Sequence, residues 1–114
     1  MRRLILMFCL AAAPAFAQDL ATGDQIKAAL SGNTVIGSMV ASGAYTEFYA
    51  EDGKIRAADY AGAWSVQGDT MCFAYGDGAP VCWGVRLSGD QVTWVSGAAD
   101  EGTGTILPGN PNGW

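Results

Sequence analysis

Residues 70–87 read TMCFAYGDGAPVCWGVRL and contain the strongest strand signal in the chain. Apolar side chains alternate with polar or small ones on both sides of a Gly-, Asp- and Pro-rich centre, which is typical of two antiparallel strands joined by a turn. A turn at residues 76–80 places Cys72 opposite Cys82. The same register gathers bulky residues on the reverse face, where we expect the core: Met71, Phe73, Tyr75, Val81, Trp83, Val85 and Leu87.

Cys72 and Cys82 are therefore predicted to form a disulfide between adjacent strands, on the face that carries Thr70, Ala74 and Gly84. In the chain-entropy model, closing a loop of roughly ten residues stabilises the fold by about 2.7 kcal/mol. A redox or metal pair is the alternative interpretation. The spacing does not match the two intervening residues of a thiol oxidoreductase motif, and the chain has no histidine to complete a zinc site.

The remainder of the chain continues the alternation between turn signals at Asp52-Gly53, Gly68-Asp69, Asp77-Gly78 and Gly89-Asp90. The expected strands are 33–40, 44–51, 54–60, 62–67, 70–76, 80–87, 91–96 and 103–107. This pattern predicts an all-β fold, a small antiparallel meander barrel or strongly curved sheet of seven or eight strands. A last strand is favoured because the sheet would otherwise leave an edge unpaired.

One short helix is expected before the strands, over residues 23–30. Thr22 can cap it, with Gln25 placed three residues later as in a capping box. Ile26 and Leu30 lie four residues apart and give the helix one apolar side. A helix this short needs tertiary packing to persist, so we expect it to cover one end of the sheet.

The first hairpin supplies a candidate binding surface. If Asp52-Gly53 forms a two-residue turn, Glu51 pairs with Lys54, Tyr49 with Arg56 and Tyr45 with Tyr60, while Phe48, Ala50, Ile55 and Ala57 form the core face. The predicted tyrosine stripe then faces outward and comprises Tyr45, Tyr49 and Tyr60, flanked by Glu47 and Arg56. Exposed tyrosines beside an arginine are residue types that anchor interfaces. The alternatives are cross-strand aromatic pairing that only stabilises the sheet, and coverage of the stripe by the C-terminal tail that carries Trp114.

The N-terminus indicates export. Arg2 and Arg3 precede an apolar run at residues 4–13, and a small-residue cleavage site follows at residues 15–17. We predict a signal peptide at residues 1–17 and a single disulfide-linked β domain at residues 18–114, located in the periplasm or secreted. The apolar run is too short to span a membrane, which takes roughly 20 residues. Export also favours the disulfide, because the receiving compartment is oxidising.

Charge limits the classes of partner. The full chain has a net charge of −5, and removal of Arg2 and Arg3 leaves four basic against eleven acidic residues, a net charge of −7. Nucleic acids and anionic membranes both require clustered positive charge, so neither is expected as a partner. A basic partner is compatible with this charge, as is a surface that only keeps an exported protein soluble.

The absence of histidine argues against an enzyme, because it removes the usual general base near neutral pH. The remaining candidates for acid and base are carboxylates such as Glu47 and Asp59. The hairpin register predicts a half-buried Asp59, bonded to Thr46, on the face of Phe48 and Ala57. We predict no catalytic residue, no metal and no cofactor.

Several segments together resemble small exported proteobacterial proteins of uncharacterised function. These are residues 30–35 (LSGNTV), 49–56 (YAEDGKIR), 62–69 (GAWSVQGD) and 71–73 (MCF), with the later Cys82. The resemblance implies a shared fold and transfers no site residue. The helix followed by a meander with a Gly-x-Trp strand is also similar to the lipocalin-like barrels of periplasmic protease and lysozyme inhibitors, which implies fold alone.

Three functions follow as hypotheses. The first is a non-enzymatic binding or inhibitor-like module of the cell envelope, with another envelope protein as partner and its oligomeric state open. The second is a carrier of a small apolar ligand, although Trp64, Phe73, Trp83 and Trp94 are expected to fill the interior and leave little room. The third is a carboxylate-dependent hydrolase.

Overall fold

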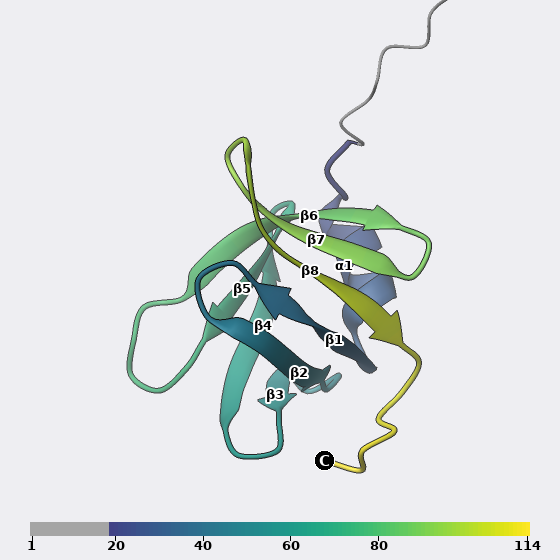
Figure 1. Ribbon diagram of the computed structural model, residues 1–114, viewed down its shortest axis with the longest axis vertical. Coiled ribbons are helices and arrows are strands. Elements are labelled where there is room, and N and C mark those ends of the chain that lie inside the picture. Colours follow the sequence, from purple (N-terminus) through teal and green to yellow (C-terminus); the bar gives the residue numbers. More distant parts are fainter. Residues whose placement is uncertain (1–18) are drawn as a thin grey trace, which may run out of the picture.

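The computed structural model describes residues 19–114, so the predicted signal peptide lies outside the described residues. Eight antiparallel strands follow one another around a closed barrel, and the first strand pairs with the last (Figure 1). The elements are α1 (Gly23–Leu30), β1 (Asn33–Met39), β2 (Gly43–Tyr49), β3 (Lys54–Arg56), β4 (Ala61–Gln67), β5 (Thr70–Ala74), β6 (Val81–Ser88), β7 (Gln91–Ser96) and β8 (Ala99–Leu107). The predicted meander barrel is confirmed.

The helix α1 forms where the capping pattern predicts it. The hydroxyl of Thr22 accepts a hydrogen bond from the Gln25 backbone N–H at 3.3 Å, and the Gln25 side chain accepts one from the Thr22 N–H at 2.9 Å. Ile26 and Leu30 are fully buried, and α1 packs against β1, β4 and β5. Among residues 19–114, no helix is long and apolar enough to cross a membrane.

The meander gives the barrel two different ends, because successive turns alternate between them. The chain enters β1 directly from α1, so α1 shares its end with the turns that follow β2, β4 and β6. The opposite end carries the loops 40–42, 57–60, 75–80 and 97–98, and we call it the open end. In Figure 1, α1 lies to the right, and the β1–β2 and β5–β6 loops lie to the left.

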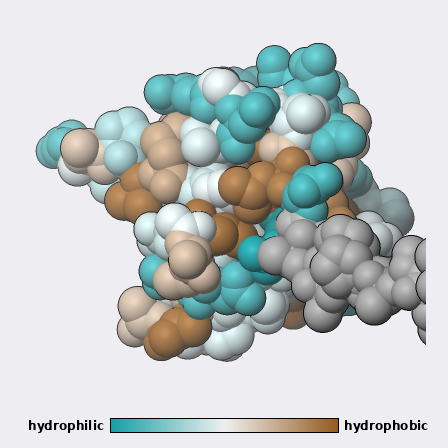
Figure 2. All heavy atoms as spheres, turned by 90° about the horizontal axis from the view of Figure 1, so that it is seen from above, coloured by the Kyte–Doolittle hydropathy of each residue, from teal (hydrophilic) through white to brown (hydrophobic). Residues whose placement is uncertain are grey.

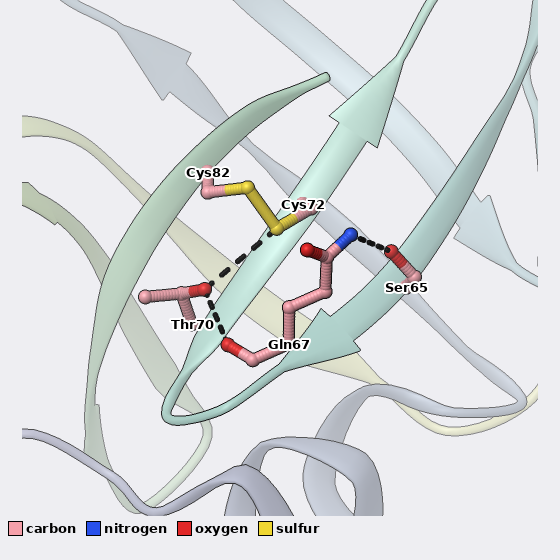
Figure 3. Close-up of a disulfide and its surroundings, with 5 residues drawn as sticks. All are labelled: Ser65, Gln67, Thr70, Cys72 and Cys82. Carbon is pink, nitrogen blue, oxygen red and sulfur yellow. Dashed lines mark hydrogen bonds between the residues drawn. A yellow bond between two sulfur atoms is a disulfide. The ribbon is translucent and has the colours of Figure 1, made fainter.

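The hairpin β5–β6 has the predicted register. Cys72 lies opposite Cys82 and the two form the predicted disulfide (Figure 3). On the same face, the Thr70 hydroxyl lies 3.7 Å from the Cys72 sulfur. Met71 and Phe73 of β5 are buried, as expected for the core face. The disulfide thus joins two strands whose reverse face packs into the barrel.

The hairpin β2–β3 corrects the sequence-based prediction. Phe48 pairs with Arg56 and Tyr49 pairs with Ile55, one residue away from the predicted register. A two-residue type I′ turn needs positive φ at both central residues, but Gly53 alone has it (φ 88°), and Asp52 does not. The Gly53 N–H instead bonds to the carbonyl of Ala50, which gives a longer turn with a glycine bulge.

That one-residue shift reverses the faces of β2, because side chains alternate across a strand. Tyr49 is fully buried and Glu47 is 5% exposed, so both lie inside the barrel rather than on its surface. Phe48, predicted for the core, is only half-buried, whereas Ile55 is buried as expected. The predicted outward orientation of the tyrosine stripe was therefore wrong.

Two strands differ from the prediction by four residues at one end, whereas the bounds of the others agree to within two residues. The third strand ends at Arg56 instead of residue 60, because the Ala57 N–H bonds to the carbonyl of Tyr60 and turns the chain. The last strand begins at Ala99 instead of residue 103. It is long because it pairs with both β7 and β1, and this double pairing closes the barrel.

Candidate functional site

A cavity of about 640 Å³ opens at the open end of the barrel. Its lining is formed by Met39, Ser42, Tyr45, Glu47, Tyr49, Tyr60, Ala61, Phe73, Tyr75, Gly76, Val81, Trp83 and Trp94. Ligand cavities in proteins commonly have volumes of about 300–1,000 Å³. The expectation that aromatic side chains fill the interior was wrong: Phe73, Trp83 and Trp94 form the wall of a cavity.

The rim of the cavity is apolar and partly exposed. Tyr60, Tyr75 and Val81 are 43%, 47% and 49% exposed, and the rings of Tyr60 and Tyr75 meet edge to face with centroids 5.9 Å apart. Val40, in the β1–β2 loop of the same end, is 80% exposed. Hydrophobic residues also reach the surface among hydrophilic ones on the face seen in Figure 2. Apolar groups at a cavity mouth favour entry of an apolar ligand.

Glu47 lies in the wall of the cavity and accepts hydrogen bonds from three tyrosines. The Tyr49 hydroxyl donates to Oε1 at 2.9 Å, and the Tyr60 hydroxyl donates to Oε2 at 2.8 Å. The Tyr75 hydroxyl lies 2.7 Å from Oε2 and 3.1 Å from Oε1. We call Glu47 with these three tyrosines the Glu47 cluster. The cluster brings together residues from β2, the β3–β4 loop and the β5–β6 loop.

Tyr45 crosses the interior next to this cluster. Its hydroxyl accepts a hydrogen bond from the Trp94 indole N–H at 2.8 Å and donates to the carbonyl of Thr103 at 3.1 Å. The phenol fits because Gly37 and Gly104, which pair across β1 and β8, have no side chains. A Cβ atom on Gly37 would lie 2.8 Å from the Tyr45 hydroxyl oxygen, and one on Gly104 would lie 2.7 Å from it.

The cavity raises the pKa of the tyrosines that line it. Burial raises the pKa of Tyr45 to about 12; the hydrogen bond from Trp94 lowers it by less than burial raises it, and the charge of Glu47 adds the smallest contribution, which raises it. Burial and Glu47 raise the pKa of Tyr49, Tyr60 and Tyr75 still further. Ionising any of these phenols would place a second negative charge beside the Glu47 carboxylate. All four hydroxyls therefore keep their protons at neutral pH.

Four of the five residues predicted for the binding surface come together in the cavity. Tyr45, Glu47, Tyr49 and Tyr60 all line it. Arg56 does not: it lies on the outside of the barrel, with its guanidinium 3.8 Å from the Asp52 carboxylate. The grouping of the tyrosines with Glu47 was thus correct, and its placement on the outer surface was not.

Sequence reasoning missed Tyr75, Trp83 and Trp94 as site residues because it assigned their apolar faces to a filled core. A signal for the cavity was present in β8, where Gly102 and Gly104 occupy alternate, inward positions. Inward glycines leave space that neighbouring strands must fill or enclose. Met39 fills the space beside Gly102, and Val35 and Tyr45 fill the space beside Gly104. Met39 and Tyr45 in turn line the cavity.

The other candidate groups lie elsewhere. Asp59 is exposed in the β3–β4 loop, so its predicted half-buried position was wrong, because the chain has left the sheet at Arg56. No group of three or more His, Cys, Asp or Glu within residues 19–114 is arranged to hold a metal ion. Comparisons with protein-family models, curated proteins and solved structures found no match to this chain.

A change at Gly104 tests the fit of Tyr45. We expect Gly104→Ala to lower the free energy of unfolding by about 1–3 kcal/mol, because the new methyl group would clash with the Val35 side chain and lie 2.7 Å from the Tyr45 hydroxyl that bonds to Trp94. Gly89→Ala is not a suitable control because Gly89 has positive φ. Gly78→Ala is suitable, since its Cβ would meet only the Tyr75 carbonyl, at 3.8 Å. Equal urea midpoints for the two variants would contradict the proposed crowding.

The raised tyrosine pKa values predict a specific response to alkali. An unfolded tyrosine ionises near pH 10, and the folded chain holds its four tyrosines protonated to higher pH. Their contribution to stability is fully present below pH 10 and is lost as the pH rises through the folded values. Phenolate absorbance of the native protein should show no ionisation step at pH 10. Urea-unfolded protein should show one step near pH 10 with the amplitude of four tyrosines. A native tyrosine that titrates at pH 10 would contradict this prediction.

Proposed function

We propose that this protein is a non-enzymatic binding protein of the bacterial cell envelope that holds a small, largely apolar ligand inside its barrel. The observation that carries the proposal is the cavity of about 640 Å³, which has aromatic walls and opens at one end. A filled barrel of this length would offer no interior site.

The two ends of the barrel differ in a way that suits such a function. At one end, α1 covers the barrel with the fully buried side chains of Ile26 and Leu30. At the open end, the rim residues are held by hydrogen bonds from Tyr60 and Tyr75 to Glu47. A wall fixed before the ligand arrives lowers the entropy cost of binding.

Two features support the envelope as the location. The first is the signal-peptide pattern of residues 1–17. The second is the disulfide between Cys72 and Cys82, since such bonds persist in oxidising compartments. The likeness in architecture to lipocalin-like barrels is compatible with ligand binding and adds no residue-level argument.

Binding of the neutral apolar dye N-phenyl-1-naphthylamine tests the proposal. We expect one dye molecule per chain, with a rise in dye fluorescence on transfer into the cavity. Val81→Trp places a large ring at the mouth, because Val81 lines the cavity from the same side of β6 as Trp83, and it should weaken dye binding at least about tenfold, a loss of about 1.4 kcal/mol of binding free energy. Ala28→Trp is the matched control, because Ala28 is exposed on α1 at the closed end.

Two outcomes would contradict the proposal. One is absence of saturable dye binding to a folded wild-type protein. The other is equal dye affinity in the Val81→Trp and Ala28→Trp variants, which would place the dye outside the cavity.

A further inference from the structure

The charge inside the cavity is unbalanced. Among residues 19–114, Glu47 is the only charged residue that lines it, and no lysine or arginine does so. The three phenols that bond to the carboxylate are neutral donors and leave its negative charge uncompensated. Burial of a charge without an opposite charge is costly, so a cationic ligand would complete the site electrostatically.

The hydrogen-bonding groups of the cavity point to the same class of ligand. The hydroxyl protons of Tyr49, Tyr60 and Tyr75 are donated to Glu47, and that of Tyr45 is donated to Thr103. These four phenols therefore present oxygen lone pairs, not protons, to an incoming molecule. A ligand group that donates hydrogen bonds fits this wall, whereas a carboxylate or phosphate finds no donor among these phenols.

The aromatic walls favour a positive charge as well. Rings of Tyr60, Tyr75, Phe73, Trp83 and Trp94 surround the space next to Glu47. The face of an aromatic ring attracts a cation within about 6 Å of its centroid, most strongly for tryptophan and when water is excluded. Alkylammonium groups are attracted in this way because their charge is spread over apolar surface.

We infer that the cavity selects a small organic ammonium ion, with the positive group beside Glu47 and the apolar body against the aromatic wall. This inference rests on the proposed function, since it names the ligand class of the same cavity.

A matched series of probes separates the two proposals: hexylammonium, hexyltrimethylammonium, 1-hexanol and hexanoate have the same chain and differ in the head group. Each probe is titrated into wild-type protein by displacement of N-phenyl-1-naphthylamine. We expect both ammonium ions to bind at least about tenfold more tightly than hexanol, and hexanoate to bind more weakly than hexanol.

Glu47→Gln tests the role of the carboxylate. The variant should lose most of the preference for ammonium over hexanol while still binding hexanol. The matched control is Glu51→Gln, the same chemical change at an exposed position in the β2–β3 turn, and it should leave the preference unchanged. Circular dichroism first establishes that both variants are folded. If Glu47→Gln does not fold, the wild-type series alone decides the inference.

The outcomes are distinguishable. Hexanol binding equal to or tighter than ammonium binding, or tighter binding of hexanoate, would overturn the inference while leaving an apolar carrier in place. Failure of the dye and of all four probes to bind would overturn the proposed function itself.

Discussion

Replacing Glu47 with alanine should lower the free energy of unfolding by about 3 kcal/mol. Three phenol hydroxyls lose a charged acceptor, and hydrogen bonds to charged groups each contribute about 1.5–3 kcal/mol. Tyr60 and Tyr75 can recover part of this loss by bonding to water, because both are partly exposed. Tyr49 recovers least, since it is fully buried when Glu47 is present and its hydroxyl has no other protein acceptor among the described hydrogen bonds.

Urea unfolding followed by circular dichroism measures this effect. Glu51→Ala, an exposed position, is the control and should change stability by no more than about 0.5 kcal/mol. Tyr49→Phe adds a second test: in the Glu47→Ala background it should cost much less than in the wild type, because its acceptor is already gone. A Glu47→Ala variant as stable as the wild type would show that the cluster does not hold the wall.

Reduction of the disulfide between Cys72 and Cys82 is expected to have the second large effect. The two residues are ten positions apart, and freeing the loop restores about 2.7 kcal/mol of chain entropy to the unfolded state. For a domain of this size, each kcal/mol corresponds to about 4–8 °C in melting temperature, so reduction should lower it by about 10–20 °C.

The melting temperature is measured with and without reducing agent, after a thiol assay has shown that both sulfurs are free. The double variant Cys72→Ser/Cys82→Ser should melt at the temperature of the reduced protein and should not respond to reductant. An unchanged melting temperature after complete reduction would contradict a stabilising role for this bond.

The β5–β6 hairpin was predictable because several signals agree on its register. The alternation of Met71 and Phe73 with Cys72, the Gly-Asp-Gly centre and the facing cysteine all require the same pairing. The last strand also followed from a general constraint, that a sheet edge is rarely left unpaired, whereas the sequence pattern did not decide between a closed barrel and a curved sheet. Local pattern and global fold are consistent in this part of the chain.

The β2–β3 hairpin was not predictable in the same way because its pattern is ambiguous. Phe48 on one face and Tyr49 on the other are both suitable for a core, so hydrophobicity does not choose between them. The turn then decides the register, and Asp52-Gly53 is compatible with two turn types that differ by one residue. Placing Glu47 inside the barrel also contradicts the rule that charged residues lie on the surface. Departures from this rule are expected at functional sites such as a ligand-binding cavity.

The tryptophans provide the most direct test of the central claim, which is that small molecules enter the barrel at the open end. Trp83 and Trp94 line the cavity. Trp64 does not: it is buried in the barrel wall, where its indole N–H donates to the Ala50 carbonyl at 2.8 Å. Trp114 belongs to the C-terminal segment beyond β8. Each indole N–H gives a separate signal in an amide nuclear magnetic resonance spectrum of the labelled protein.

Titration of the disulfide-intact protein with hexyltrimethylammonium should move the indole signals of Trp83 and Trp94 in a saturable way and leave those of Trp64 and Trp114 in place. No saturable movement with this probe or with N-phenyl-1-naphthylamine, or movement confined to Trp114, would contradict a ligand site inside the barrel.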